Sequence, residues 1–201
     1  SCGLIYLVGQ KLFSRAAGIA AGLILACYAP AIFYDALIEK SILDLTLLSL
    51  LLFLLLNGGT ANGWAKWLGA GVLLGLLGLS RENALILAPV IVLWLFLRFA
   101  NEAMALRARW LGLFFAGLLL VLLPVGLRNL IVGGEFKLTT SQFGANFYIG
   151  NNPAADGTYG SVRNIIHETQ LEGPDAKRLA ERALGRALSA GEISGYWVGQ
   201  A

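Results

Sequence analysis

Charged residues, cysteine and histidine are all scarce in this sequence. Aspartate, glutamate, lysine and arginine make up only 13% of the 201 residues, whereas 57% are hydrophobic, and the mean hydropathy is +0.71. A water-soluble globular domain carries about 25% charged residues, so this scarcity excludes such a domain over most of the chain. The solvent for the fold is therefore mostly lipid.

The scarce residues also narrow the chemistry. Cys2 and Cys27 both lie in apolar surroundings and indicate neither a disulfide framework nor a metal site. The single histidine, His167, lies in the polar tail far from the other candidate residues, so we name no metal ligand and no cofactor, and dependence on a divalent metal is left open. No Walker loop and no Rossmann fingerprint is present. The pI near 9.0 does not indicate nucleic acid, because the charge is spread among loops and one short helix.

Apolar stretches dominate the first two thirds of the chain. They lie at residues 16–34, 41–56, 67–79, 84–97 and 110–127, and residues 1–8 look like the end of another. A helix needs about 20 residues to cross roughly 30 Å of hydrocarbon. We therefore predict an all-α polytopic membrane protein, with about five to six transmembrane helices in residues 1–127, followed by a small mixed extracytoplasmic segment at residues 128–201. Because Ser1 is not an initiator Met and lies in an apolar run, we interpret the chain as an internal fragment.

The apolar block at residues 69–97 is too long for a single span. Four polar residues, Ser80, Arg81, Glu82 and Asn83, interrupt it, and they are costly at the middle of a bilayer. A helical hairpin with these residues at its tip fits the pattern. A re-entrant pair that does not cross completely is the alternative.

The basic residues of the short loops indicate the orientation. If the spans alternate, most of them fall on one side, which should be cytoplasmic. These residues are Lys11, Arg15, Lys66, Arg98, Arg107 and Arg109. Near the membrane on the opposite side, only Lys40, Arg81 and Arg128 remain.

A basic residue on this depleted side either anchors a helix end by snorkelling or binds an anion. Glu82 and Asn83 accompany Arg81 between two apolar helices, which makes a compact polar group at the depth of lipid headgroups. A guanidinium stays charged, and its fork of donors matches two phosphate oxygens. Arg81 is therefore a candidate phosphate ligand, and so is Arg128, where a helix leaves the membrane.

A second polar cluster contains Asp35, Glu39, Lys40 and Asp44. Asp35 and Glu39, and likewise Lys40 and Asp44, are four residues apart and can share helical faces. Glu39 and Lys40 lie at the entry to a span, where they either pair with each other or orient a headgroup. Asp44 lies inside the apolar stretch, so its carboxylate needs a partner.

The polar tail begins with a strand signal at residues 135–140, behind the Gly133-Gly134 turn, and continues as a loop. In this loop four residues present amide and phenol groups of the kind that recognise sugar hydroxyls. They are Asn146, Tyr148, Asn151 and Asn152. Such residues are also ordinary turn formers, so a local structural role is the alternative.

A helix is predicted from Pro174-Asp175 to about Ser189, with Asp175 as its cap. One apolar stripe along this helix is expected to pack on the membrane domain. The stripe consists of Leu179, Ala183, Leu184 and Leu188.

Two segments of the membrane region resemble a known family. Residues 28–34 (YAPAIFY), with Glu39 and Lys40 before an apolar helix, resemble the exit of the third helix in GT-C-type membrane glycosyltransferases. Residues 75–84 (GLLGLSRENA) are similar to a recurring hairpin of that family, with Glu82 where proline is more usual.

The strongest resemblance follows the last apolar stretch. LPVGLRN at residues 123–129, then GGEF at 133–136 and GANFYIGNN at 144–152, resemble the passage by which bacterial members leave a helix and begin their extracytoplasmic region. ISGYW at 193–197 resembles the segment before their next membrane helix.

The relatives include protein O-mannosyltransferases and lipid A aminoarabinose transferases, which generally use a sugar linked to a polyprenyl phosphate. The resemblance implies transfer of a hexosyl or pentosyl group from such a donor to a lipid, glycan or protein acceptor, at the outer face of the bacterial inner membrane. It also implies that the acidic catalytic residue lies in a first extracytoplasmic loop upstream of Ser1. The chain then lacks the first helix and that loop, and is inactive alone.

The resemblance also suggests roles for the candidate residues. Arg81 and Arg128 would bind the donor phosphate, with Glu39 and Lys40 supporting catalysis. The expected ligands of the sugar or the acceptor are Asn129, Tyr148, Asn151 and Asn152. The implied partners are the polyprenyl-phosphate sugar donor, membrane lipid and an unknown acceptor, and not nucleic acid.

Two other classes of function stay open at this stage. A transporter or lipid flippase also has broken apolar helices and charges near the membrane. The charges here gather at span ends on one face, as an interfacial site requires. A non-catalytic membrane scaffold, whose extracytoplasmic part binds partners, is the third class.

Overall fold

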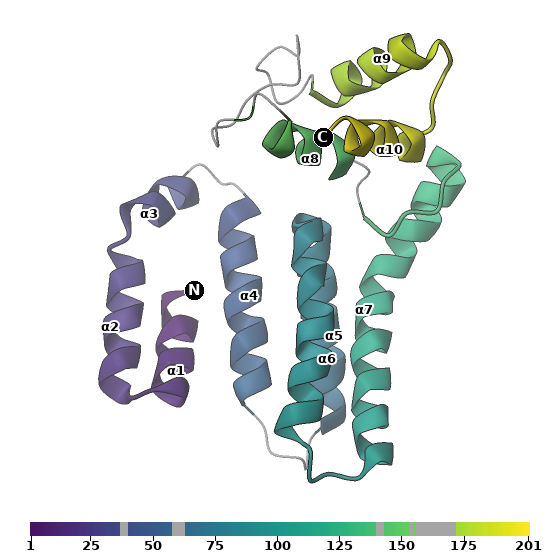
Figure 1. Cartoon of the computed structure of the whole chain (residues 1–201). Helices are drawn as coiled ribbons and strands as arrows, with labels where there is room; N and C mark the ends of the chain where they lie inside the picture. The colour runs from purple at the N-terminus through teal and green to yellow at the C-terminus, as the bar shows by residue number, and fades with distance from the viewer. Residues whose placement is uncertain (37–39, 58–62, 140–142, 153–154, 156–171) are drawn as a thin grey trace. The chain divides into compact units, whose positions relative to one another are not determined.

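The computed structural model describes residues 1–36, 40–57, 63–139, 143–152, 155 and 172–201 (Figure 1). The chain divides into two compact units, Ser1–Val125 (unit 1) and Gly126–Ala201 (unit 2). Unit 1 contains α1 (Cys2–Leu12), α2 (Arg15–Ala26), α3 (Ala29–Ala36), α4 (Lys40–Leu56), α5 (Gly63–Ser80), the 3-10 helix η2 (Glu82–Ile86), α6 (Leu87–Arg98) and most of α7 (Met104–Gly133). Unit 2 contains the end of α7, α8 (Phe143–Asn151), α9 (Glu172–Leu184) and α10 (Ala190–Gln200).

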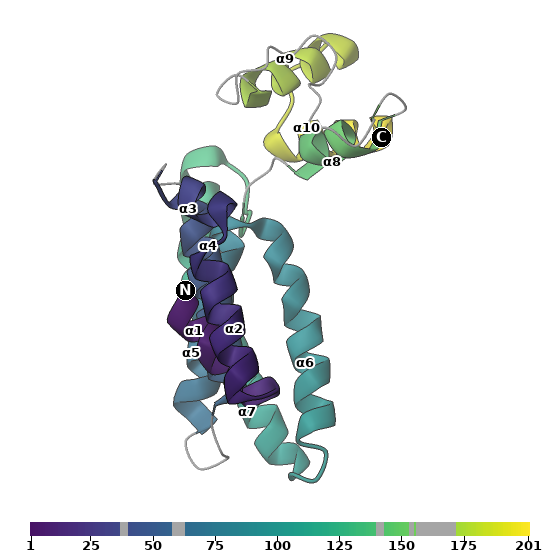
Figure 2. The ribbon, with the colours of Figure 1, turned by 90° about the vertical axis from the view of Figure 1, so that its left-hand side faces the viewer.

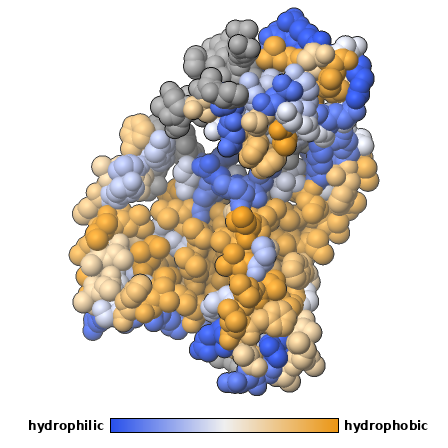
Figure 3. All heavy atoms as spheres, viewed as in Figure 1, coloured by the Kyte–Doolittle hydropathy of each residue, from blue (hydrophilic) through white to orange (hydrophobic). Residues whose placement is uncertain are grey.

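The long helices of unit 1 run roughly side by side (Figures 1 and 2). Helices α1 and α2 form a hairpin, and α4 packs on both α1 and α5. The core draws fully buried side chains from four helices: Leu51 of α4, Trp67 and Leu74 of α5, Leu95 of α6 and Phe114 of α7. Hydrophobic residues also cover much of the outer surface of these helices (Figure 3), as expected of helices that face lipid.

Two helices in the described part of the chain, α5 and α7, are long and apolar enough to cross a membrane. The expectation of five to six spans is therefore not confirmed. Local breaks shorten the other helices. The Ser14 hydroxyl accepts the Ala17 amide at 3.1 Å and caps α2, so α1 and α2 have only 11 and 12 residues. Twelve residues rise only about 18 Å.

The stretch expected to span at residues 16–34 is also interrupted. Helix α2 ends at Ala26, and the short α3 begins at Ala29. By contrast, α7 is longer than expected, because it continues past residue 127 to Gly133. Gly134, at φ +73°, then takes a left-handed conformation that ends the helix without strain.

The predicted interruption of residues 69–97 is confirmed. Helix α5 ends at Ser80, Arg81 is extended, and η2 precedes α6. Helix α6 then runs back antiparallel to α5 (Figure 2). Asn83 lies within η2, so the tip of this hairpin is shorter than the polar tetrapeptide.

The elements that carry the basic residues predicted to share one side all end at one end of unit 1. The α1–α2 turn, the start of α5 and the α6–α7 connection all lie at the same end (Figure 1). Lys66 is in the first turn of α5, and Arg98 is the last residue of α6. The opposite end holds the start of α4 and the end of α5.

The described residues of unit 2 form helices and connecting turns but no strand, so the prediction of a mixed segment is wrong for these residues. Residues 135–139 form no strand. Their polar groups bond to neighbouring helices instead: the Lys137 carbonyl accepts the Asn129 side chain at 2.8 Å, and the Glu135 carboxylate accepts the Gly191 amide at 3.1 Å. A strand needs a neighbouring strand, and the described residues provide none.

The segment predicted as a loop around Asn146 is helix α8. Glycine and asparagine favour helices only weakly, so packing must compensate. Gly144 lies directly against the backbone of Ser194 in α10. The ring centres of Tyr148 and Trp197 are 4.9 Å apart. Close contact with α10 therefore stabilises α8.

The helix predicted from 174 to 189 is instead two helices. Gly185, at φ +69°, ends α9, and Ser189 caps α10. Asp175 lies inside α9, where it is buried and pairs with Arg178, so its prediction as the cap is wrong. From the predicted stripe, Leu179 packs on a cluster of unit 2 itself, formed by Ile149, Ala176 and Trp197.

Candidate functional site

Asp44 and Arg81 form an ion pair at the end of unit 1 opposite the basic residues. One Asp44 oxygen, Oδ2, accepts Arg81 Nε at 2.9 Å. The other, Oδ1, accepts the Ser80 hydroxyl. The Asp44 side chain is 16% exposed and that of Arg81 is 51% exposed. Arg81 is therefore the partner that the sequence required for Asp44.

Lys40 joins the same group from one turn earlier in α4. Its ammonium donates to the Ser80 carbonyl at 3.4 Å. Lys40, Asp44, Ser80 and Arg81 together form what we call the Asp44 cluster. Glu39 lies outside the described residues, as does the side chain of Asp35.

The fold explains why these four residues meet. Helices α4 and α5 are antiparallel neighbours, so the first turns of α4 lie beside the last turn of α5. The last carbonyls of a helix carry partial negative charge and attract a cation such as Lys40. Arg81 is the first residue after α5, and its extended backbone (φ −135°, ψ 100°) marks the end of the helix.

The cluster has an excess of positive charge, with two cations and one carboxylate. Asp44 contacts Arg81 through Nε, and no ion pair joins the terminal guanidinium nitrogens to a residue in the described part of the chain. These nitrogens are the pair of donors that best matches two phosphate oxygens. The half-exposed Arg81 can therefore bind an anion while it stays paired with Asp44.

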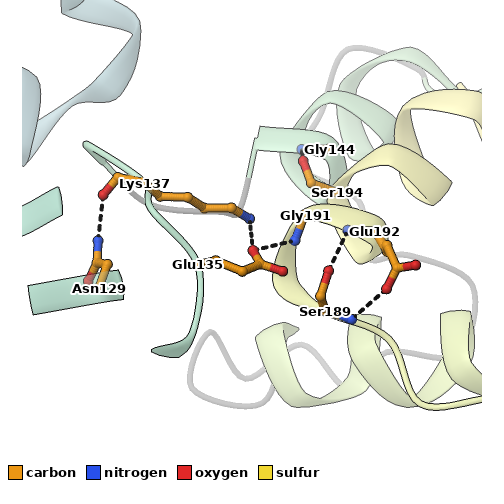
Figure 4. A network of polar contacts seen from close by, with 8 residues as sticks. All are labelled: Asn129, Glu135, Lys137, Gly144, Ser189, Gly191, Glu192 and Ser194. Carbon is orange, nitrogen blue, oxygen red and sulfur yellow. Dashed lines mark hydrogen bonds and ion pairs between the residues drawn. The ribbon is translucent and has the colours of Figure 1, made fainter. Parts of the chain in front are cut away.

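The other candidate residues belong to unit 2. Arg128 is exposed on α7, five residues before that helix ends. Its neighbour Asn129 is half-buried, and its amide donates to the Lys137 carbonyl (Figure 4). Asn129 thus fixes the turn that follows α7.

The asparagines of α8 also have local partners. The Asn151 amide donates to the Phe147 carbonyl at 2.9 Å, and that of Asn152 donates to the Tyr148 carbonyl at 3.0 Å. Both satisfy the last carbonyls of the helix. Asn146 is exposed. Whether these residues also bind sugar or acceptor stays a prediction.

A family model described as dolichyl-phosphate-mannose-protein mannosyltransferase matches residues 1–127. The chain belongs to this family. The match confirms the resemblance to GT-C glycosyltransferases, and it covers the whole Asp44 cluster. No curated protein and no solved structure matches the chain.

Membership of this family indicates a membrane glycosyltransferase of the GT-C type. The described residues contain no group of three or more histidine, cysteine, aspartate or glutamate side chains that could hold a metal ion. His167 lies outside the described residues. In the part of this family member that the structure describes, the Asp44 cluster is the polar group best suited to an anionic substrate.

Sequence reasoning missed a second polar network, in unit 2 (Figure 4). Glu135 accepts Lys137 Nζ at 2.8 Å and the Gly191 amide at the start of α10. The pKa of Glu135 lies below its ordinary value, mainly because of the hydrogen bond from Lys137. This network ties the turn after α7 to α10. In the sequence, the spacing of Ser189 and Glu192, which is typical of a capping box, was the feature that could have indicated the start of α10.

The sequence analysis placed Lys66 among the basic residues of the short loops and did not predict its burial. Its ammonium donates to the Leu55 carbonyl at 2.8 Å, and it lies 5.2 to 5.9 Å from the ring centres of Trp67, Trp94 and Phe99. Lys66 is buried, so these contacts offset the cost of its charge. It joins the end of α4 to α5 and α6 at the end of unit 1 opposite the Asp44 cluster.

Proposed function

We propose that the protein moves a hexosyl or pentosyl group from a polyprenyl-phosphate-linked donor to an acceptor, and that Arg81 binds the donor phosphate. The acceptor is a lipid, a glycan or a protein. The observation that carries this proposal is the Asp44 cluster, in which the half-exposed Arg81 binds Asp44 through Nε and its terminal nitrogens form no ion pair with the described residues. Family membership supports the class of donor.

The chemistry needs positive charge at this point. When the bond between the sugar and the phosphate oxygen breaks, the polyprenyl phosphate departs with an additional negative charge. A guanidinium held at the phosphate stabilises that charge in the transition state. Lys40, on the other side of Ser80, adds a second cation close by. The acceptor hydroxyl or amine loses its proton to a general base.

The reaction is assigned to the extracytoplasmic side of a bacterial inner membrane. The end of unit 1 that carries Lys11, Arg15 and Arg98 is rich in basic residues, which favours the cytoplasm. The Asp44 cluster lies at the opposite end of these helices. On this orientation, residues 128–201 are extracytoplasmic.

We assign supporting roles to the remaining candidates. Arg128 is exposed and cationic, which suits a second phosphate contact or an anchor at the headgroups. Glu39 would orient the donor or the acceptor. The ligands of the sugar or acceptor are proposed to be Asn129, Tyr148, Asn151 and Asn152.

The test is transfer of labelled sugar from a polyprenyl-phosphate donor by membranes that carry the protein. Arg81→Ala should lower kcat/KM by about 100-fold or more, the size of effect seen when one donor of a charge-stabilising site is removed. The matched control is Arg109→Ala, because Arg109 is also an exposed arginine but lies near the start of α7, at the other end of unit 1. It should leave transfer unchanged.

Other outcomes would change the assignment. Equal transfer by Arg81→Ala and the parent, at equal abundance, would make Arg81 a helix-end anchor and leave the enzyme class intact. A parent that transfers no sugar from any donor, but moves polyprenyl-linked lipid between leaflets, would favour the flippase.

A further inference from the structure

Both oxygens of the Asp44 carboxylate are already occupied. Oδ1 accepts the Ser80 hydroxyl and Oδ2 accepts Arg81 Nε. A carboxylate has about four acceptor positions, so these two contacts do not exhaust its capacity. They do fix its orientation, because one oxygen is held by Ser80 and the other by Arg81.

We propose that Asp44 and Ser80 are positioning residues that orient the Arg81 guanidinium toward the donor phosphate. This inference rests on the proposed function and adds two residues to it. Asp44 holds Arg81 by Nε, and the two terminal nitrogens form a separate edge of the same planar group. Ser80, as the last residue of α5, holds Asp44 in turn.

Such positioning matters because a free arginine is a flexible side chain. Holding it in one orientation costs rotamer entropy. A site that has already ordered its arginine binds phosphate more tightly and stabilises the departing charge better. Asp44 is suited to this role because it is itself largely buried and extends from the well-packed helix α4.

A positioning role and a purely electrostatic role for Asp44 predict opposite changes in donor affinity for one substitution. Asp44→Asn removes a negative charge close to the phosphate site. If Asp44 acted only through its charge, the variant would bind the anionic donor more tightly. If Asp44 positions Arg81, the variant binds the donor more weakly although the site has become more positive.

The experiment compares four proteins in membranes: the parent, Asp44→Asn, Arg81→Ala and the double variant. Asp44→Asn should raise the donor KM by about three- to tenfold, the range expected for one coupled pair, and leave the acceptor KM unchanged. In the double variant, Asp44→Asn should add nothing to the effect of Arg81→Ala. Ser80→Ala should raise the donor KM in the same direction by a smaller factor.

Direct binding separates this inference from the proposed function. Binding of undecaprenyl phosphate to the purified protein is measured by native mass spectrometry for the same four proteins. A parent that transfers sugar, with Asp44→Asn equal to the parent or tighter in binding, overturns the positioning role alone. A parent that neither transfers sugar nor binds the lipid phosphate overturns both proposals.

Two further results guard against a purely structural role for Asp44. If the effects of Asp44→Asn and Arg81→Ala multiply, Asp44 acts independently of Arg81 and the inference is wrong. If Asp44→Asn does not fold, Asp44→Glu takes its place, because it keeps the charge and lengthens the side chain by one methylene. It should bind undecaprenyl phosphate less tightly than the parent at an unchanged melting temperature, and equal binding would overturn the inference.

Discussion

Among the carboxylates that pair with an arginine in the described residues, Asp44 and Glu192 lie in contrasting surroundings. Asp44 is largely buried in unit 1 and pairs with Arg81. Glu192 is exposed at the start of α10, where it accepts Arg186 at 2.7 Å and the Ser189 amide at 2.9 Å. The bond from Arg186 is the main reason why the pKa of Glu192 falls to about 2.

The lowered pKa of Glu192 predicts a pH-dependent helix start. Because the pKa in the folded protein is about 2 and the ordinary value is 4.5, the contribution to stability is present above pH 4.5 and is lost as the pH falls toward 2. Amide hydrogen exchange at the first turn of α10, corrected for intrinsic rates, should therefore speed up over this range.

Glu192→Gln is the control for this prediction. Glutamine keeps the acceptor of the capping box but does not titrate. Its exchange at the first turn of α10 should stay constant over the same pH range, after correction. If the exchange rates of the parent and the variant change with pH in the same way, a group other than Glu192 causes the change.

At the scale of helices, α5 and α7 approach each other through glycine. A Cβ atom on Gly71 would overlap the Phe114 carbonyl oxygen, and one on Gly117 would overlap the Leu68 carbonyl oxygen. Small residues let membrane helices bring their backbones together, which increases van der Waals contact. This contact joins the two longest apolar helices of unit 1.

Gly71→Ala should destabilise the protein by about 1–3 kcal/mol, because the methyl group forces α5 away from α7. The measurement is the apparent melting temperature in detergent. The matched control is Gly112→Ala on α7, where a Cβ atom meets nothing within 4 Å. Alanine favours helix over glycine by about 1 kcal/mol, so this control should melt at an equal or higher temperature. If the melting temperature fell equally in both variants, the result would contradict close packing of α5 on α7.

At the scale of the whole molecule, unit 1 has two chemically distinct ends. One end collects basic residues together with buried aromatic rings around Lys66, and the other carries the Asp44 cluster. A membrane enzyme that takes its donor on one side requires this kind of asymmetry. The proposed orientation can be tested without any substrate.

Cysteine labelling in intact cells tests the orientation. In a variant with Cys2 and Cys27 replaced by serine, Asn101→Cys in the α6–α7 connection should resist a membrane-impermeant maleimide, because the proposed orientation places it in the cytoplasm. Arg182→Cys in α9 should react, because the same orientation places it outside. Both positions are exposed in the structure. The reverse pattern would invert the assignment, and reaction at both would rule out the proposed spans.

Several features were predictable because they depend on composition or on neighbours along the chain. The scarcity of charge predicted a membrane protein, four polar residues predicted the break after Ser80, and alternating spans predicted the shared basic end. The motif around Arg81 lies within the family match, whereas the motifs from Arg128 onward lie beyond its end at residue 127. The expected five to six spans are not confirmed, because only α5 and α7 among the described helices are long and apolar enough to cross a membrane. Breaks such as that between Ala26 and Ala29 are not visible in the hydropathy.

The sequence by itself determined the apolar character, the helical class and the family of this protein, since each follows from residues read in order. Only the tertiary structure decided that Asp44 pairs with Arg81, 37 residues away, and that α8 is a helix and not a loop. A buried carboxylate needs a partner, but the sequence does not show which cation the fold brings near. A weak helix former such as Asn146 or Gly144 follows the packing that surrounds it, and contact with α10 outweighed local preference.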